Sequence, residues 1–137
     1  MRRPSPLVLL LALTACGPEA YYEGAICPAP EALAEFKDGD DLDIVIMLDP
    51  CPPGCGGDTR TECHVTRDGN TIDIDAQGTY QKRGGTAGCA AVCRPLMATC
   101  TVGNLDAGTY TINSGTHSLE VTIPSDDPPK YESDCPY

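Results

Sequence analysis

The stretch Leu105-Asp106-Ala107-Gly108-Thr109-Tyr110 leads into the middle one of three strands predicted for the C-terminal third of the chain. The predicted strands cover residues 97–102, 108–113 and 117–123. Glycine-containing turns separate them, and Pro124 ends the last one. Several short strands at this spacing predict an all-β protein built as a β-sandwich.

The same stretch resembles the entry to the penultimate strand of immunoglobulin-like domains. In those domains a tyrosine shortly after the turn hydrogen-bonds back across the corner, an arrangement called the tyrosine corner. The resemblance covers roughly the last three strands, and it implies this role for Tyr110. The chain has no Trp, so the core tryptophan of antibody domains is missing. The expected fold class is a disulfide-rich, immunoglobulin-like β-sandwich with one or two short helices.

The preceding part of the chain adds strands and short helices to this fold. Residues 43–48 are nearly all apolar and predict a strand buried on both faces. The alternating runs 63–66 and 71–75 flank Asp68-Gly69, which predicts a hairpin. Residues 29–36 predict a short helix. Three further segments are predicted as a loop, a flexible connection and one or two helical turns: residues 51–57, 84–88 and 89–94.

The N-terminus has the pattern of a secretory signal peptide. Arg2 and Arg3 form a basic start, and a short apolar run follows over residues 7–13. The run ends in Leu13-Thr14-Ala15-Cys16, which resembles the lipobox of bacterial lipoproteins. The resemblance implies that Cys16 receives a diacylglycerol and becomes the first residue of the mature chain. Gly17 stands where an Asp would imply retention in the inner membrane, so the resemblance favours the outer membrane, on its periplasmic face or at the cell surface.

Three segments follow from this interpretation. Residues 1–15 are the expected signal peptide, residues 16–26 a lipidated tether, and residues 27–137 a single disulfide-stapled domain. Cleavage removes Arg2 and Arg3 from a chain with 9 basic and 20 acidic side chains, which leaves a net charge of −13. So acidic a surface repels nucleic acid and anionic lipid headgroups. The expected partners are therefore the membrane, through the lipid on Cys16, and a protein or an envelope polymer.

Nine cysteines are present, and lipidation of Cys16 accounts for the odd one. The other eight are an even number in an oxidising compartment, so four disulfides are expected. These candidates are Cys27, Cys51, Cys55, Cys63, Cys89, Cys93, Cys100 and Cys135. With no Trp and a single Phe, the core is thin, and each disulfide adds about 2–4 kcal/mol.

The positions of the cysteines suggest how they pair. Cys27 lies just beyond the tether and Cys135 near the chain end, so a bridge between them would pin both ends. Cys89 and Cys93 lie on one face of a helical turn, about 5–6 Å apart and too far for a mutual bond. We expect them to bridge to Cys51 and Cys55, in either of two connectivities. Cys63 then pairs with Cys100.

A metal site is the alternative use of the cysteine-rich segments. Cys51, Cys55, Cys89 and Cys93, with His64 and His117, are the ligand types that zinc or copper uses. The spacing is Cys-x3-Cys twice without a matching histidine pair, so disulfides are favoured. The run Asp38-Gly39-Asp40-Asp41-Leu42-Asp43 has the wrong order for an EF-hand loop, and an acidic turn is favoured over a Ca²⁺ site.

No catalytic pattern accompanies these residues. His64 and His117 lack a Gly-x-Ser-x-Gly elbow or an acidic partner at a characteristic spacing. The sequence therefore predicts a membrane-anchored envelope lipoprotein that acts as a non-catalytic binding or structural module, without a cofactor. The alternative function is a metal-binding or redox-active envelope protein that uses the Cys-x3-Cys segments.

Overall fold

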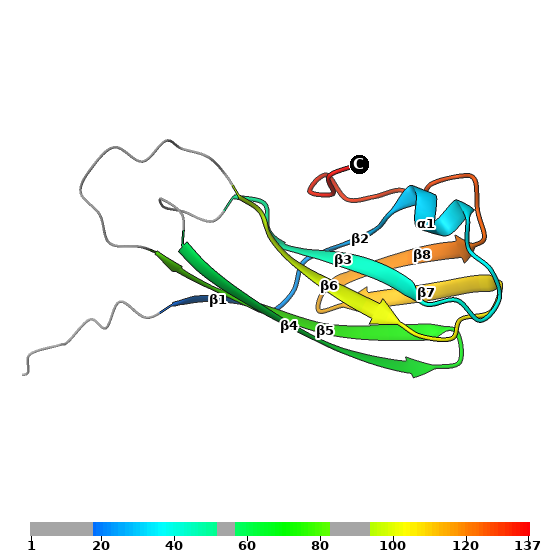
Figure 1. Ribbon diagram of the computed structural model, residues 1–137, viewed down its shortest axis with the longest axis horizontal. Helices are drawn as coiled ribbons and strands as arrows, with labels where there is room; N and C mark the ends of the chain where they lie inside the picture. The colour runs from blue at the N-terminus through cyan, green and yellow to red at the C-terminus, as the bar shows by residue number, and fades with distance from the viewer. Residues whose placement is uncertain (1–17, 52–56, 83–93) are drawn as a thin grey trace, which may run out of the picture.

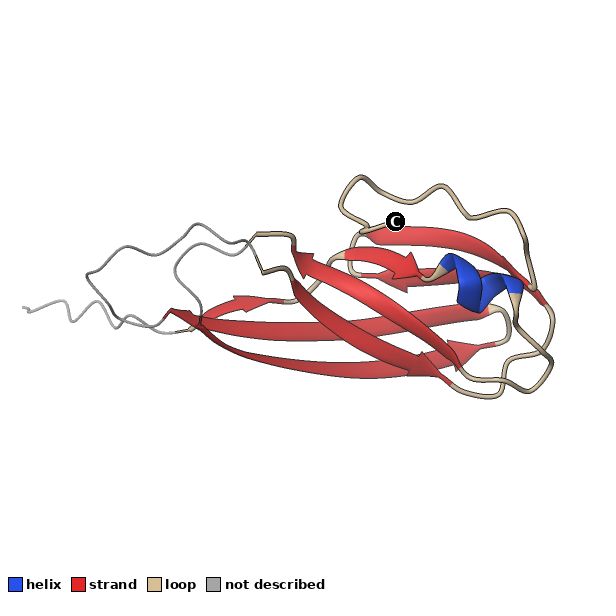
Figure 2. Ribbon diagram, turned by 45° about the horizontal axis from the view of Figure 1, so that its top comes forward, coloured by secondary structure: helices blue, strands red, loops and turns tan. Residues whose placement is uncertain are grey.

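The computed structural model describes residues 18–51, 57–82 and 94–137, in which strands dominate and one helix is short (Figures 1 and 2). The strands are packed as two sheets, so the expected all-β sandwich is confirmed. The strands are β1 (Glu19–Tyr21), β2 (Ala25–Pro28), β3 (Leu42–Asp49), β4 (Gly57–Asp68), β5 (Thr71–Lys82), β6 (Leu96–Val102), β7 (Gly108–Ser114) and β8 (His117–Ile123). The helix is α1 (Pro30–Ala34).

The smaller sheet has the strand order β2-β3-β6 and is antiparallel. Its central strand, β3, is buried on the core side but only partly on the other face, where Asp43 is exposed and Val45 half-buried, so the predicted burial on both faces holds only in part. Ile44 and Ile46 are fully buried in the core between the sheets. On the opposite face Met47 packs in a small second cluster with Ala25 and Cys27.

The larger sheet has the order β1-β5-β7-β8, and β4 pairs with the other edge of β5. Strands β5 and β7 run parallel, whereas immunoglobulin domains have antiparallel sheets. The hairpin between β4 and β5 turns at Gly69 and Asn70, and Gly69 has a φ of 58° that favours glycine. Ile72 and Ile74 point into the core while Asp73 and Asp75 are exposed, as predicted.

The fold begins earlier than the sequence indicates. A tether was expected over residues 16–26, but Glu19–Tyr21 pairs with β5 as β1. Ala25 and Ile26 are each 2% exposed and belong to β2. The local sequence does not indicate these contacts, because the neighbouring residues are polar. The partner of β1 is also a strand about sixty positions further along the chain.

Tyr110 forms the tyrosine corner that the resemblance implies. Its hydroxyl donates to the main-chain oxygen of Asp106 at 2.9 Å, and the ring is 3% exposed. The guanidinium of Arg67 lies 5.4 Å from the ring centroid. The corner therefore fixes the entry to β7 against the end of the β4–β5 hairpin.

Two disulfides connect described residues, and both agree with the expected pairs. Cys27 is bonded to Cys135, across a sequence separation of 108 residues. Cys63 on β4 is bonded to Cys100 on β6, which ties the edges of the two sheets together. Cys51 is disulfide-bonded as well. Cys51 and Cys55 are expected to bridge to Cys89 and Cys93. Because Cys55, Cys89 and Cys93 lie outside the described residues, this pairing stays a prediction.

The carboxylate of Glu23 joins the connection between β1 and β2 to the β7–β8 turn. It accepts hydrogen bonds from the Thr116 N–H at 2.7 Å and from the Thr116 hydroxyl at 3.1 Å. These bonds, helped by the nearby charge of His117, hold the pKa of Glu23 below its ordinary value. A carboxyl with a lowered pKa stabilises the fold above its unfolded pKa of about 4.3, and that contribution is lost as the pH falls through its folded pKa.

We therefore expect Glu23→Gln to melt at a lower temperature than the unaltered protein at pH 7. The difference should shrink as the pH falls and vanish below the folded pKa of Glu23, where the native side chain is also uncharged. Thermal unfolding at a series of pH values measures this. Glu35→Gln, at an exposed position on the α1 side of the molecule, controls for the loss of one negative charge. A difference that persists unchanged at acid pH would contradict the role of the Glu23 charge.

Candidate functional site

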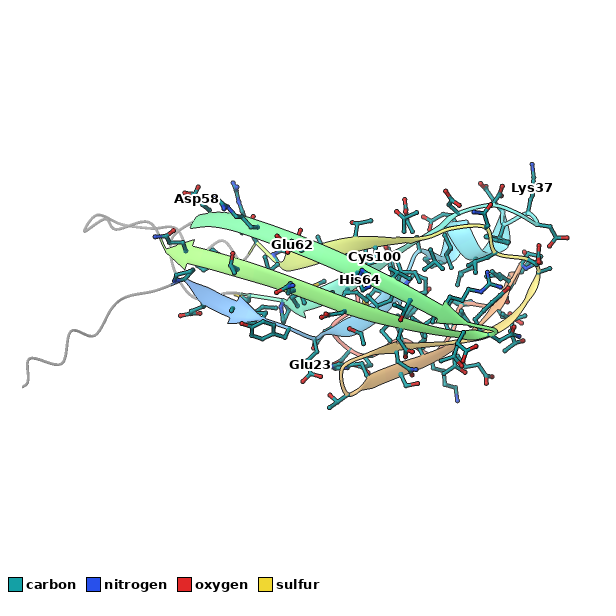
Figure 3. The ribbon with its side chains drawn as sticks, turned by 90° about the horizontal axis from the view of Figure 1, so that it is seen from below. Glu23, Lys37, Asp58, Glu62, His64 and Cys100 are labelled. Atoms are coloured by element: carbon teal, nitrogen blue, oxygen red, sulfur yellow. A yellow bond between two sulfur atoms is a disulfide. The ribbon has the colours of Figure 1, made fainter. Side chains whose placement is uncertain are left out.

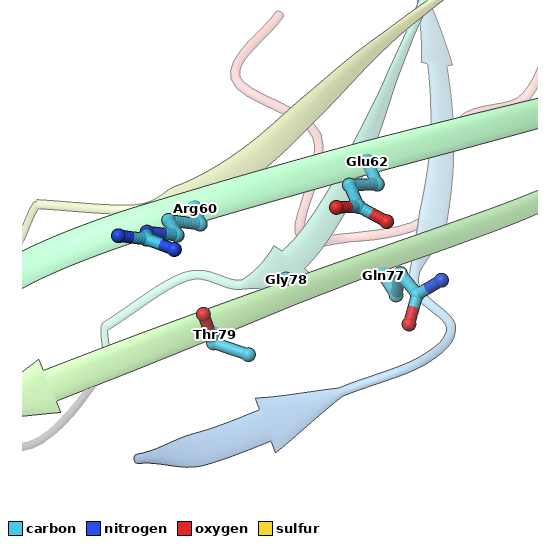
Figure 4. A pocket seen from close by; sticks show the side chains of 5 residues that line it. All are labelled: Arg60, Glu62, Gln77, Gly78 and Thr79. Carbon is cyan, nitrogen blue, oxygen red and sulfur yellow. The ribbon is translucent and has the colours of Figure 1, made fainter.

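The outer face of the β4–β5 ribbon carries a shallow hollow of about 240 Å³. Its lining residues are Arg60, Glu62, Gln77, Gly78 and Thr79. Figure 4 shows the side chains of β4 facing those of β5 across the hollow. The strand register places Arg60 opposite Thr79 and Glu62 opposite Gln77, so two cross-strand pairs form the site.

The chemistry of the hollow is that of hydrogen bonding. Arg60 offers five N–H donors, the ionised Glu62 carboxylate only accepts, and Gln77 and Thr79 can both donate and accept. Among the described residues, these four side chains make no ion pair or hydrogen bond with one another or with a neighbour. Their polar groups are therefore available to a ligand that carries both donors and acceptors.

Gly78 lets the strand below the hollow lie close to the opposite sheet. A Cβ atom at this position would come 2.6 Å from Cδ1 of Leu48 and 3.1 Å from Cδ2 of Leu96. A Cβ atom here would require these two leucine side chains to shift, so the glycine allows β5 to pass close beneath them. The same close packing fixes the position of Gln77 and Thr79 on the exposed face.

The sequence did not predict the hollow. The expected hairpin strands were residues 63–66 and 71–75, whereas β4 starts at Gly57 and β5 ends at Lys82. Apolar alternation does continue along β5, through Ala76 and Tyr80, which are both buried. That alternation was the available signal, and the polar residues between its members hid it.

The two histidines lie apart from the hollow. His64 is exposed on β4, on the face opposite Cys63 and Val65, as predicted. His117 begins β8, and its Nδ1 lies 2.7 Å from Oε2 of Glu132 in the C-terminal tail. Each therefore occupies a separate strand position, and the structure does not bring them to one site.

The acidic run at residues 38–43 supports neighbouring loops. Asp41 accepts from the Asn104 N–H at 3.0 Å, and Asp40 accepts from the Lys37 N–H at 3.0 Å. Asp38 accepts from the N–H of Ala107. These carboxylates satisfy backbone donors near the tyrosine corner, which agrees with an acidic turn.

Within residues 18–51, 57–82 and 94–137, no group of three or more His, Cys, Asp or Glu side chains is arranged to hold a metal ion. Cys63 and Cys100 are bonded to each other. The expected lipidation site, Cys16, and the ligand candidates Cys55, Cys89 and Cys93 lie outside the described residues. The described part of the chain also has no helix with the length and apolar character needed to cross a membrane.

Comparison with known protein families assigns the chain to one of them. A family model described as the ORF11 beta-sandwich domain matches residues 50–125, which are more than half of the chain. The protein therefore belongs to the ORF11 beta-sandwich domain family. The match spans β4 to β8 and includes every residue of the hollow. No curated protein and no solved structure matches the chain.

Proposed function

We propose that the protein is a lipid-anchored, non-catalytic binding module of the cell envelope. The lipobox resemblance at Cys16 supports the anchor, and the stapled sandwich supplies a rigid scaffold beyond it. The observation that carries the binding role is the hollow of the β4–β5 ribbon, where four polar side chains have no described partner. Rigid strands position such groups more accurately than loops do.

The hollow suits a hydroxyl- and amide-bearing envelope polymer. It is shallow and open to solvent, and the side chains on its exposed face can donate and accept hydrogen bonds with neutral polar groups. Nucleic acid is disfavoured because the mature chain has a net charge of −13. A polymer ligand would extend along the ribbon and meet Gln77 and Thr79 together.

The anchor and the binding site can be tested separately. Incorporation of labelled palmitate into the full-length chain, and its recovery in the membrane fraction, should both be lost on Cys16→Ser. Labelling that persists in this variant would exclude Cys16 as the lipid attachment site.

For the binding site, the probe is isolated cell-wall sacculi. Every described strand, α1 and both described disulfides lie between residues 18 and 137. The binding experiment uses a chain that begins at Gly17, contains all of these elements and is exported to an oxidising compartment, and thermal unfolding verifies that it is folded. We expect it to co-sediment with sacculi, and Gln77→Ala combined with Thr79→Val to weaken binding several-fold, since each hydrogen bond contributes about 0.5–1.5 kcal/mol.

The matched control is Thr99→Val, the same substitution at an exposed threonine on β6 in the other sheet. It should leave binding unchanged. If the control and the β5 double variant bind equally well, the hollow is excluded as the binding site. No sedimentation by the unaltered chain would overturn the polymer as ligand.

A further inference from the structure

The outer edge of β4 is a long strand edge to which no described strand is hydrogen-bonded, although β6 of the smaller sheet lies near it and is joined to it by the Cys63–Cys100 disulfide, whose Cα atoms are 5.6 Å apart. β4 spans Gly57–Asp68 and pairs along its whole length with β5. No other strand in the described part of the chain pairs with it. Figure 3 shows this strand at the border of the larger sheet, with Glu62 and His64 on its exposed face. Such an edge is a template for pairing with another chain.

The register shows which backbone groups point outward. Thr111 N–H donates to the main-chain oxygen of Asn70 at 2.9 Å, on the β7 side of the hairpin. Because backbone groups alternate in direction along a strand, even-numbered residues of β5 face β7 and odd-numbered ones face β4. Asp68 pairs with Thr71, so the even-numbered residues of β4 bond to β5. The odd-numbered residues of β4, Thr61 among them, present N–H and C=O groups to the open edge.

The charges beside Thr61 are self-complementary. Arg60 and Glu62 lie two positions apart and therefore on one face of the strand. An edge with charges of a single sign would repel a second copy, whereas this edge has opposite signs on either side of Thr61. We propose that the outer edge of β4 pairs antiparallel with the same edge of a second copy of this chain, about a two-fold axis at Thr61.

In this register Arg60 of each copy lies opposite Glu62 of the other, so the symmetry makes each opposite-charge pair twice. Thr61 lies opposite itself, with its outward N–H and C=O groups aligned for hydrogen bonding. Asp58 lies opposite His64 on the same face. The two larger sheets then become one continuous sheet, and the two hollows meet at its centre.

Neighbouring registers are disfavoured by the same charges. Moving the axis to position 60 places Arg60 against itself and Glu62 against Asp58. Moving it to position 62 places Glu62 against itself. Like charges directly opposite destabilise a strand pair. The charge pattern therefore selects the axis at Thr61 and not merely the use of this edge.

Charge exchange tests the proposal, and sedimentation equilibrium is the measurement. The exported chain beginning at Gly17 is used at ~0.15 M salt, where the Debye length of about 8 Å screens the net charge more than the direct pairs. We expect a monomer–dimer equilibrium. Arg60→Glu and Glu62→Arg should each weaken dimerisation about ten-fold or more, because each replaces two attractive pairs by two repulsive ones.

Two recombinations make the test specific. The double variant Arg60→Glu/Glu62→Arg exchanges the charges and should dimerise like the unaltered chain. An equimolar mixture of the two single variants should form heterodimers, because positions 60 and 62 are both acidic in one variant and both basic in the other. Thr61→Pro removes one outward N–H at the axis and should abolish dimerisation, while thermal unfolding verifies that the fold survives, since proline is tolerated at the open side of an edge strand.

A monomer at every concentration up to ~1 mM, the range of weak association, would overturn the proposal. So would a dimer that the charge variants leave unchanged, since it would use another face. The double exchange failing to recover dimerisation would exclude the Thr61 register. No lipid or sacculi are present in these experiments, so their outcome is independent of the anchor and of ligand binding.

Discussion

Replacing Cys27 and Cys135 together by alanine is expected to lower the free energy of unfolding by about 4–5 kcal/mol. The bridge closes a loop of sequence separation 108, and the loop-closure entropy of so long a loop amounts to about 4.7 kcal/mol at 25 °C. Urea unfolding under oxidising conditions measures the loss. Removing both cysteines avoids a free thiol, which would complicate the comparison.

The bridge also holds the C-terminal tail over β3. The described residues after Ile123 form no strand, and they are attached near Cys135 by the disulfide and by the Tyr131 hydroxyl, which donates to the Pro28 oxygen at 2.7 Å. Met47 is 4% exposed beneath this region. Loss of the bridge should therefore expose the tail to proteolysis before the rest of the domain unfolds.

The second disulfide provides the matched comparison. Cys63→Ala with Cys100→Ala removes a bridge of sequence separation 37, for which the same relation gives about 1 kcal/mol less. We expect this variant to retain more stability than the one without Cys27 and Cys135. The reverse order would show that connecting the two sheets matters more than closing the long loop.

The parts of the fold that the sequence predicts have a local cause, except for the disulfide that joins the two ends of the domain. Asp68-Gly69 predicts a hairpin because few residues accept the positive φ at Gly69. Tyr110 marks a corner because its partner, Asp106, is four positions away. The Cys27–Cys135 bridge follows from the positions of both residues at the ends of the domain. Each of these features can be inferred from a few neighbouring residues or from the chain ends.

The parts that the sequence does not predict depend on distant partners. Strand β1 exists because Glu19–Tyr21 reaches the far end of β5, which local polarity gives no reason to expect. The parallel pairing of β5 with β7 joins strands that are separated by all of β6. The hollow was missed for the same reason. Arg60 and Gln77 lie on parts of β4 and β5 beyond the predicted runs 63–66 and 71–75, and the polar sequence of these parts is typical of a loop. Local pattern indicates where a strand can form, and tertiary contacts decide how far it extends.

Leu105 shows how a residue between strands can be part of the core. It lies in the connection before β7 and is 0% exposed. Its N–H donates to the main-chain oxygen of Asp40 at 3.1 Å, and its main-chain oxygen accepts from the Gly39 N–H at 2.7 Å. These bonds hold the connection against the end of the sandwich, so the side chain closes the core beside the tyrosine corner.

We expect Leu105→Ala to lower the free energy of unfolding by about 2–5 kcal/mol, because a buried leucine loses both its transfer energy and its packing contacts. Two hydrogen bonds fix the backbone here, so the loop cannot easily collapse into the space left. Leu119→Ala is the control, since Leu119 on β8 is only partly buried against the same core. Urea unfolding should give a distinctly smaller loss for Leu119→Ala, and equal losses would mean that the loop at Leu105 relaxes to fill the cavity.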